Sequence, residues 1–231
     1  MKHLGIFGGT FNPIHYGHLR VAVEVLEKVI LEKIVFIPSA QPPHKSHSDI
    51  ANVFDRLKMT QLAIRSYPLF ECSNIETQRQ GLSYTIDTIH ELQNQSPHDV
   101  QFYYLIGKDA FFAIHTWKSF EMLFEIIPFI VMSRPEISHD SKIPNNRFME
   151  YIQQTISQDY VYLQNDKCMV HPNKKPIYYC QVTALDISSS QIRASLKNGR
   201  SIQYLLPDTV LNYIHDNQLY ETRNCYDQKQ S

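Results

Sequence analysis

Two histidines near the amino terminus follow a pair of glycines in a pattern that suits phosphate chemistry. Gly8 and Gly9 end a short apolar run, and His15 and His18 follow with Gly17 between them. Residues three positions apart lie on one side of a helix, so both imidazoles can donate hydrogen bonds to one phosphoryl group. Glycines let the backbone approach an anion, and a helix start offers unpaired N–H groups. We therefore predict a phosphate site here, although an isolated pair with this spacing would fit surface or capping histidines.

A second segment of similar chemistry lies near residue 190. Ser188, Ser189 and Ser190 precede Arg193 at the start of a predicted helix. Serine hydroxyls and backbone N–H groups, with a guanidinium about one turn further on, form a cradle for the β- and γ-phosphates of a nucleoside triphosphate. The alternative is a serine-rich helix cap beside a solvated arginine, since serine is common at caps.

Three further segments carry groups that can bind a small charged molecule. His44 and Lys45 follow two prolines, which stiffen the loop and exclude a helix. Ser83 can cap a predicted helix, whose first residues up to Thr85 form another candidate anion site. Trp117 is the only tryptophan and can offer an aromatic face to a flat ring, although large aromatic residues also fill cores.

The end of another predicted strand carries a carboxylate. Asp109 lies just beyond this strand, where it can accept hydrogen bonds from ribose hydroxyls, and Gly107 lets a base approach the backbone. Arg56 and Arg134 either add positive charge to the same region or lie on the surface as structural arginines.

The elements expected to position these groups alternate between strand and helix up to about residue 135. Buried strands are predicted over residues 3–7, 33–38, 70–75, 100–106, 126–133 and 177–184. Helices are predicted over residues 15–31, 49–66, 83–95, 188–197 and 207–217, with short helices over 111–124. A strand–helix–strand crossover makes its two strands parallel. The predicted fold class is therefore α/β, with a Rossmann-like, doubly wound parallel sheet and a small C-terminal helical subregion.

The chain of 231 residues is long enough for one sizeable core. We predict a single domain over residues 1–221, with an irregular or inserted lobe at 136–178. The C-terminal helical part is expected at 188–220, and residues 222–231 are expected to form a tail.

Composition excludes several classes of protein. With 43% hydrophobic and 19% charged residues, the sequence is that of an ordinary soluble globular protein. A net charge of -1 provides no global basic field, so we expect no nucleic-acid partner. No apolar run is long enough for a membrane span or a signal peptide. The 4 cysteines have no C-x-x-C spacing, which favours reduced thiols and a cytoplasmic protein.

The motifs and their order resemble those of a known enzyme family. Residues 8–18 are similar to the His-x-Gly-His signature of the nucleotidylyltransferase superfamily. Further motifs occur in the order typical of bacterial nicotinate-mononucleotide adenylyltransferase, and the match spans residues 3–220. They are Pro42-Pro43-His44-Lys45, the stretch 81–88, the stretch 105–109 with Trp117, the stretch 187–193 and the closing stretch 206–220.

The resemblance implies transfer of AMP from ATP to nicotinate mononucleotide, with no covalent intermediate. The implied catalytic residues are His15, His18 and Arg193. The implied ATP contacts are Gly8, Gly9, Thr10, Phe11, His18, Gly107, Asp109, Ser188, Ser189 and Arg193. The implied acceptor contacts are His44, Lys45, Ser83, Tyr84, Thr85, Trp117 and Arg134. Mg²⁺ would be carried on the ATP phosphates, without a dedicated metal site in the protein.

One departure and two alternatives accompany the resemblance. Ser190 stands where family members usually carry threonine, so the hydroxyl is kept and a methyl group is lost. The same signature serves transfer to phosphopantetheine or to alcohol phosphates, but residues 83–87 and Trp117 argue against those acceptors. A non-catalytic protein could instead bind zinc through His15, His18, His44 and His47, although structural zinc sites usually include cysteine.

Overall fold

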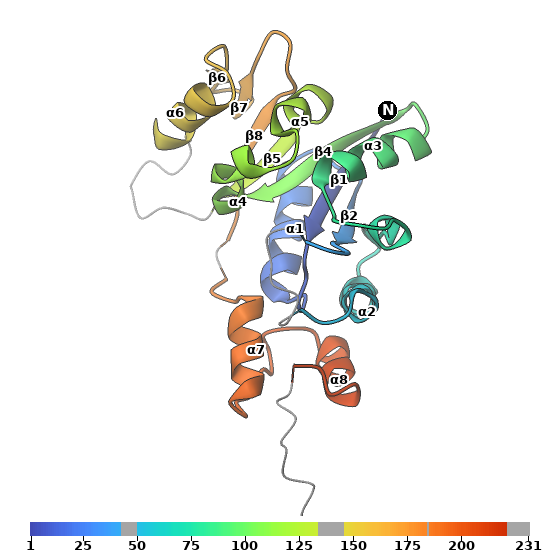
Figure 1. Ribbon diagram of the computed structural model, residues 1–231. Coiled ribbons are helices and arrows are strands. Elements are labelled where there is room, and N and C mark those ends of the chain that lie inside the picture. Colours follow the sequence, from blue (N-terminus) through green and yellow to red (C-terminus); the bar gives the residue numbers. More distant parts are fainter. Residues whose placement is uncertain (43–49, 134–145, 184, 221–231) are drawn as a thin grey trace, which may run out of the picture.

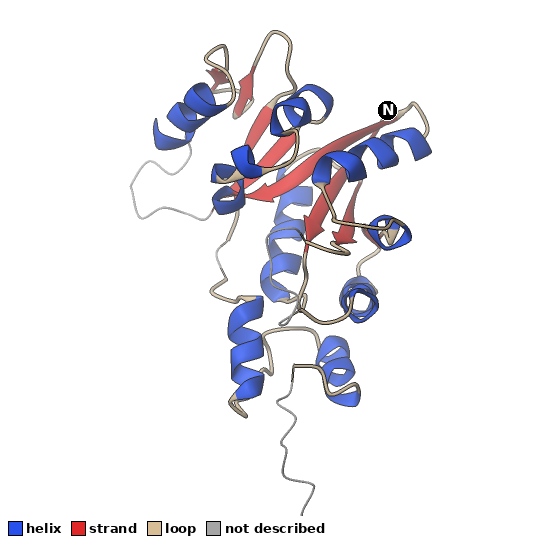
Figure 2. Ribbon diagram, viewed as in Figure 1, coloured by secondary structure: helices blue, strands red, loops and turns tan. Residues whose placement is uncertain are grey.

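In the described part of the chain, eight strands form one sheet with helices on both faces (Figures 1 and 2). The computed structural model describes residues 1–42, 50–133, 146–183 and 185–220. The strand order is β3-β2-β1-β4-β5-β8-β7-β6. The strands are β1 (Lys2–Gly9), β2 (Lys33–Pro38), β3 (Phe70–Cys72), β4 (Val100–Gly107), β5 (Phe129–Ser133), β6 (Val161–Leu163), β7 (Cys168–Val170) and β8 (Ile177–Gln181).

The sheet is parallel from β3 to β8, which confirms the predicted Rossmann-like α/β class. The chain moves outward from β1 in one direction through β2 and β3, and in the other direction through β4 and β5. This reversal creates a crevice at the carboxyl ends of β1 and β4, where ligands bind in doubly wound sheets. The fold therefore brings the end of β1, with Gly8 and Gly9, to the expected place for a site.

Helices cover both faces, and those that were predicted agree with the structure to within a few residues, whereas α6 was not predicted. They are α1 (Tyr16–Lys28), α2 (Val53–Ile64), α3 (Thr85–Gln95), α4 (Lys108–Phe112), α5 (Phe120–Ile126), α6 (Asn146–Thr155), α7 (Ser189–Lys197) and α8 (Asp208–Asp216). Two short 3₁₀ turns are η2 (Ile75–Gln78) and η3 (Ile114–Thr116). In the described residues, no helix is long and apolar enough to cross a membrane.

Alternating residues of each central strand supply two separate cores. Phe7 packs with residues of α1, α2, α7 and α8 on one face, whereas Ile6 packs with residues of α3, α4 and α5 on the other. Successive side chains of a strand point to opposite faces, so a buried central strand needs apolar residues at both kinds of position. The apolar runs of β1, β2 and β4 meet this need, and the two cores fix the sheet from both sides.

The described part of residues 136–178 adds regular structure to one end of the sheet. The hairpin of β6 and β7 continues the sheet beyond β8, with β7 antiparallel to β8. Phe148 and Ile152 of α6 are fully buried and pack into the same core as Phe129 of β5. Figure 1 shows these elements at the end of the molecule away from α7 and α8. The single-domain limits remain a prediction.

Three predicted details were wrong. Strand β3 ends at Cys72 because the chain turns into η2 at Ile75. Helix α2 begins at Val53, where the Asn52 side chain accepts a hydrogen bond from Phe54 N and so caps the helix. Ser83 does not cap α3, which begins after Tyr84 without a side-chain cap. The Ser83 hydroxyl has other partners, which are described below.

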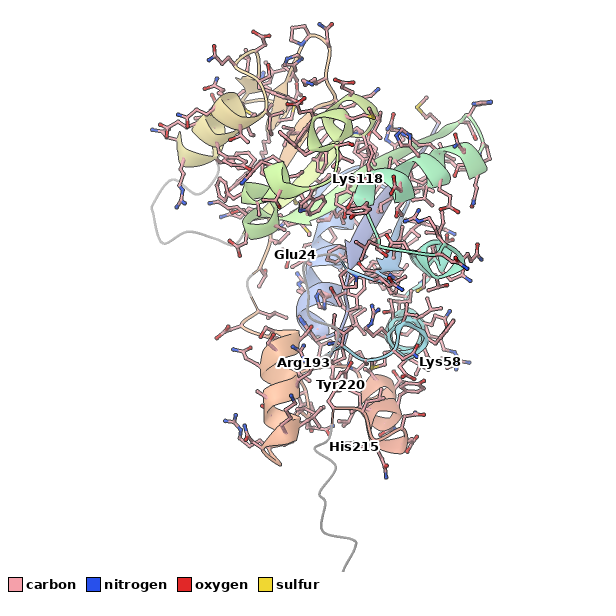
Figure 3. All side chains as sticks on the ribbon, viewed as in Figure 1. Glu24, Lys58, Lys118, Arg193, His215 and Tyr220 are labelled. Carbon is pink, nitrogen blue, oxygen red and sulfur yellow. The ribbon has the colours of Figure 1, made fainter. Side chains whose placement is uncertain are left out.

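A buried carboxylate joins α1 to the chain that leads from β8 toward α7. Glu24 accepts hydrogen bonds from Arg20 at 2.7 Å, Lys28 at 2.9 Å and the backbone N–H of Thr183 at 3.0 Å. Burial alone would raise the pKa of Glu24, but these donors, Lys28 foremost, lower it to about 2. Glu24 is labelled in Figure 3 and fixes the helix that follows the predicted phosphate site.

Candidate active site

The β1–α1 loop (residues 10–15) crosses the carboxyl end of β1 and is packed against its own strand. Phe11 is buried and has a left-handed backbone, with φ of 46°. A Cβ atom at Gly9 would lie 2.9 Å from the Phe11 ring, so only glycine allows this packing. Asn12 follows, is 4% exposed, and lies next to the cis peptide bond to Pro13. The loop is therefore a fixed turn that leads directly into α1.

The two predicted histidines stack on each other at the start of α1. His15 is the N-cap residue, and its ring centroid lies 3.7 Å from that of His18, with 30° between the planes. The backbone N–H of His15 donates to Nδ1 of His18 at 3.3 Å. Because this nitrogen accepts a hydrogen bond, a neutral His18 ring carries its proton on Nε2. The structure thus brings both predicted histidines together and leaves His18 with a defined donor atom.

His15 is the more buried member of the pair. It is 5% exposed, and burial lowers its pKa to about 4, so the ring is neutral at pH 7. Its Nδ1 atom is buried and has no hydrogen-bond partner among the residues that the structure describes. A Cβ atom at Gly17 would lie 2.9 Å from this nitrogen, so Gly17 leaves space for the imidazole.

The buried guanidinium of Arg56 anchors the β1–α1 loop through hydrogen bonds to backbone carbonyl groups. It is 1% exposed and donates to three backbone carbonyl groups: Thr10 at 2.7 Å, Ala51 at 2.9 Å and Ala40 at 3.1 Å. Burial lowers its pKa, although the carboxylate of Glu76 opposes this effect. Arg56 is therefore a structural cation under the predicted phosphate site, and not a surface residue.

The start of α7 reaches the same loop from the C-terminal part of the chain. Ser188 caps α7 in a reciprocal pair with Gln191. The Ser189 hydroxyl donates to the carbonyl of Pro13 at 2.8 Å, and Arg193 donates to the carbonyl of Asn12 at 2.8 Å. Figure 3 shows Arg193 between α7 and the lower end of the sheet. The two predicted phosphate segments, about 180 residues apart, thus share one hydrogen-bonded assembly.

Two of the predicted acceptor residues, Thr85 and Trp117, lie beside Tyr104 of β4. The hydroxyl of Tyr104 lies 3.4 Å from Oγ1 of Thr85, and the edge of its ring meets the half-buried Trp117 at 6.1 Å between centroids. Tyr104 is buried, which raises its pKa to about 12 and keeps the phenol protonated. A Cβ atom at Gly8 would lie 2.8 Å from this hydroxyl. Tyr104 therefore lies between the end of β1 and the start of α3.

Ser83 and Glu76 shape the chain that follows β2. The Ser83 hydroxyl accepts hydrogen bonds from the N–H groups of Ala40 at 3.0 Å and Gln41 at 3.1 Å. Glu76 accepts from Ala40 N at 3.2 Å and from the Thr88 hydroxyl at 2.7 Å. These bonds fix the backbone of Ala40 and Gln41, shortly before the predicted His44 and Lys45, which lie outside the described part of the chain. A direct contact of Ser83 with a substrate remains a prediction.

An exposed ion pair lies beside the start of α3. Lys118, labelled in Figure 3, contacts both carboxylate oxygens of Asp87, at 2.9 and 3.0 Å. Its ammonium group also lies 4.8 Å from the centroid of the Tyr84 ring. Asp87 is in the first turn of α3, so Lys118 neutralises a negative charge close to the predicted anion site.

Gly107 and Asp109 are exposed at the carboxyl end of β4, next to β1 in the sheet. A Cβ atom at Gly107 would meet nothing within 4 Å, so the space beside it is open. His44, Lys45 and Arg134 lie outside the described residues, and so does His47. In the parts of the chain that the structure describes, no three His, Cys, Asp or Glu side chains are grouped to hold a metal ion. Cys72, Cys168 and Cys180 are free thiols.

Comparison with known proteins identifies the family. A family model described as Cytidylyltransferase-like matches residues 6–195. A probable nicotinate-nucleotide adenylyltransferase of Desulfatibacillum aliphaticivorans is 42% identical over 223 residues, which cover 94% of this chain and 99% of the relative. A protein with the same name from Geotalea daltonii is 40% identical over 94% of this chain and 97% of the relative. The chain belongs to the nicotinate-nucleotide adenylyltransferase family.

A solved structure of the same kind of enzyme supports the fold. The nicotinic acid mononucleotide adenylyltransferase of Plasmodium falciparum, complexed with NaAD, has a TM-score of 0.71 and covers 95% of this chain and 98% of its own. Its sequence identity is 19%, so this similarity supports the fold alone. Together with the family membership, it confirms the resemblance inferred from the motifs.

Four residues around the site were missed or left undecided by the sequence. They are Asn12, Arg56, Tyr104 and Tyr220. Arg56 was equally compatible with a surface position, because nothing in its neighbourhood along the chain indicates burial. Tyr104 belongs to an apolar strand, where a tyrosine is an ordinary core residue. Tyr220 contacts Asn12 across 208 positions of sequence, a separation that no local pattern reveals.

Proposed function

We propose that this chain transfers AMP from ATP to nicotinate mononucleotide and so forms nicotinate adenine dinucleotide and pyrophosphate for NAD biosynthesis, in the cytoplasm. The observation that carries the proposal is the junction of the β1–α1 loop with the start of α7. Two stacked histidines, a serine hydroxyl and an arginine meet there at the carboxyl end of β1. This is the position at which doubly wound sheets bind nucleotides.

The proposed chemistry is in-line displacement at the α-phosphorus of ATP. The 5′-phosphate of the acceptor is ionised near neutral pH, so the reaction needs neither a general base nor a nucleophile from the protein. Catalysis then depends on alignment and on stabilisation of the charge that shifts during transfer. His18 donates from Nε2 to the α-phosphoryl group, and the buried His15 supports it as a neutral ring. Ser189 and Arg193 hold the departing pyrophosphate.

The remaining proposed ATP contacts lie at the same carboxyl end of the parallel strands. Gly8, Gly9, Thr10 and Phe11 form the turn on which the phosphates lie, and Ser188 offers the start of α7. Asp109 binds the ribose hydroxyls, and Gly107 leaves room for adenine. Mg²⁺ would be held mainly by the phosphate oxygens of ATP and by water, and it would supply positive charge to the leaving group.

The acceptor lies toward α3. The N–H groups at the start of α3 and the Thr85 hydroxyl bind the nicotinate carboxylate, with Ser83 and Tyr84 beside them and Trp117 against the pyridine ring. His44, Lys45 and Arg134 are proposed partners of the acceptor phosphate. A carboxamide would place its own N–H₂ group against these donors and leave them unpaired, which is costly in a closed site. The acid is therefore the proposed acceptor.

The test is pyrophosphate release from ATP and Mg²⁺ with a panel of acceptors. The panel contains nicotinate mononucleotide, its amide, phosphopantetheine and an alcohol phosphate. The specificity constant should be highest for the acid, and the product should be the dinucleotide. Equal constants for acid and amide would show that the start of α3 does not recognise the carboxylate. Activity with phosphopantetheine or the alcohol phosphate alone would overturn the proposed acceptor class.

A further inference from the structure

Tyr220 lies beyond the last helix and returns the chain to the β1–α1 loop. Leu219 N donates to the carbonyl of Ile214 at 2.9 Å, and Gln218 and Tyr220 both have left-handed backbones, with φ of 50° and 66°. Such conformations are costly for residues other than glycine and persist only where surrounding contacts hold them. Figure 3 shows Tyr220 close to Arg193, between α7 and α8. This strained turn orients the Tyr220 side chain toward the β1–α1 loop.

The contact made by this ring is with the residue at the centre of the loop. The hydroxyl of Tyr220 donates to Oδ1 of Asn12 at 2.8 Å, and the same oxygen accepts from Ala51 N at 3.0 Å. The carbonyl of Asn12 accepts from Arg193 at 2.8 Å. Asn12 is thus tied to α7, to the start of α2 and to the segment after α8. It lies only three positions before His15.

The phenol of Tyr220 stays protonated near neutral pH. Burial raises the pKa of its phenol, although Arg193 and Arg56 act in the opposite direction. The hydroxyl is therefore a permanent donor, and its acceptor is the side-chain oxygen of Asn12 that also accepts from Ala51 N. A neutral phenol also does not compete with phosphate for the two arginines.

We propose that Tyr220 is a positioning residue for nucleotidyl transfer: its hydroxyl fixes Asn12 and thereby the loop that carries the stacked histidines. This inference rests on the proposed function of that loop. In-line transfer requires the phosphoryl group to be aligned with its donors, and an error of about 1 Å can lower rates by about 100-fold. Loss of one of several bonds to Asn12 loosens the loop only in part, so a smaller effect is expected.

The test compares two tyrosine-to-phenylalanine variants from the same region. Tyr220→Phe removes the bond to Asn12, whereas Tyr213→Phe removes a bond of similar length, 2.9 Å, from α8 to Asp55 of α2. Each variant loses one hydroxyl, and we expect each to lower the Tm by about 2–4 °C. Only Tyr220→Phe should lower kcat, by about tenfold, with the KM for the acceptor changed less than about twofold.

A double-variant experiment tests whether the effect passes through Asn12. In an Asn12→Ala background, Tyr220→Phe should have no further effect on kcat, because its partner is already absent. Equal losses of kcat in Tyr220→Phe and Tyr213→Phe would mean that Tyr220 has only a structural role and would overturn the proposal. Independent, multiplicative effects of Tyr220→Phe and Asn12→Ala would also overturn it.

The design separates this inference from the proposed function. All variants are assayed with whichever acceptor gives the highest rate for the wild-type chain, and ATP-induced stabilisation is measured beside it. An error in the identity of the acceptor would appear in the wild-type panel, while the ratio between the two tyrosine variants would still report on positioning.

Discussion

The two sides of the proposed site are held by different kinds of contact. On the ATP side, the β1–α1 loop is fixed by hydrogen bonds from the buried Arg56 of α2 and from three half-buried side chains, Ser189 and Arg193 of α7 and Tyr220 at the end of the described chain. On the acceptor side, Trp117 is half-buried and the ion pair of Lys118 with Asp87 is exposed, with side-chain exposures of 47% and 36%. The ATP side is therefore held by a hydrogen-bonded network anchored on a buried cation, whereas the charged groups of the acceptor side are exposed to solvent.

This difference implies that the ATP side aligns the reacting phosphoryl group, whereas the acceptor side selects the acceptor. Catalysis by charge stabilisation needs donors that do not reorganise during the reaction, and such donors are found in buried, hydrogen-bonded networks. Recognition of the acceptor needs complementary charge and a flat surface, which side chains near solvent can supply at modest energetic cost. Substitutions on the ATP side should therefore lower turnover strongly, and those on the acceptor side should change selectivity weakly.

His18→Ala should have the largest effect on activity. Its Nε2 proton is the donor proposed for the α-phosphoryl group, and removal of one such donor lowers turnover by about 10²–10³-fold in comparable sites. Folding should be little changed, because the ring is only partly buried. The measurement is kcat together with the thermal unfolding curve. A variant that retains more than half of the wild-type turnover would show that His18 does not contact the reacting group.

The burial of His15 predicts that stability falls in mild acid. Its pKa is about 4 in the folded chain and near 6.5 in an unfolded one, so the unfolded state binds more protons between these values. Stability contributed by the neutral ring is complete above about pH 6.5 and is lost as the pH falls toward 4. The loss is on the order of 3 kcal/mol in the free energy of unfolding, at about 1.4 kcal/mol for each pKa unit.

This pH dependence is measured by urea unfolding of the wild-type chain and of His15→Asn between pH 7 and 4. The variant retains a side chain suited to an N-cap and removes the titrating group, so its curve should be flatter. His90→Asn, at an exposed position on α3, controls for the substitution itself. Parallel curves for wild type and His15→Asn would contradict the burial of a neutral His15.

Arg193→Ala should weaken ATP more than the acceptor. The guanidinium holds the carbonyl of Asn12 and is proposed to contact the β- and γ-phosphates, and a charge-assisted bond of this kind contributes roughly 1.5–3 kcal/mol. Apparent affinities for both substrates are compared, with Arg193→Lys as the control that keeps the charge. Lysine should restore part of the ATP affinity. A loss of affinity confined to the acceptor would show that α7 does not bind the phosphates of ATP.

The sequence predicted the parts of this comparison that depend on local pattern. Apolar runs and helical spacing gave the strands β1, β2 and β4 and the helices α1, α3, α7 and α8 to within a few residues. The Gly8-Gly9 turn followed by His15 and His18 was sufficient to locate the site, because a strand end, a turn and a helix start are adjacent in sequence. The lobe at 136–178 was expected to be irregular or inserted, but its described part forms α6 and the β6–β7 hairpin, which are stabilised by packing against the rest of the sheet.

Contacts between distant segments could not be predicted in the same way. The sequence around Arg56 is that of an ordinary helix, and it does not reveal that the guanidinium donates hydrogen bonds to the carbonyl groups of Thr10 and Ala40. Ser83 had the features of an N-cap, but its hydroxyl accepts hydrogen bonds from the backbone N–H groups of Ala40 and Gln41, in the segment after β2. In both cases, the partner is a backbone group whose position depends on tertiary packing and not on residue type.

Lys118→Met should produce the smallest effect, and it should fall on the acceptor alone. Removal of the ammonium group leaves Asp87 unpaired in the first turn of α3, close to the proposed binding site of the nicotinate carboxylate. Like charges then repel, but both groups are exposed, so the effect is that of a surface pair, about 0.2–1 kcal/mol. The KM for the acid should rise about threefold at low salt, and the amide and ATP should be unaffected.

The salt dependence and a matched variant decide whether that small effect is electrostatic. Lys174 forms another lysine–carboxylate ion pair, with Glu125 at 3.3 Å, near the amino end of β8 and therefore at the opposite end of the strands, although its side chain is less exposed than that of Lys118, at 18% against 47%. Lys174→Met should leave all three KM values unchanged. For Lys118→Met, the difference between acid and amide should shrink as ionic strength rises, because exposed charges are screened. An equal rise for the acid and the amide would indicate that Lys118 supports the acceptor through its contact with Tyr84, and charge would then have no part in selecting the acid.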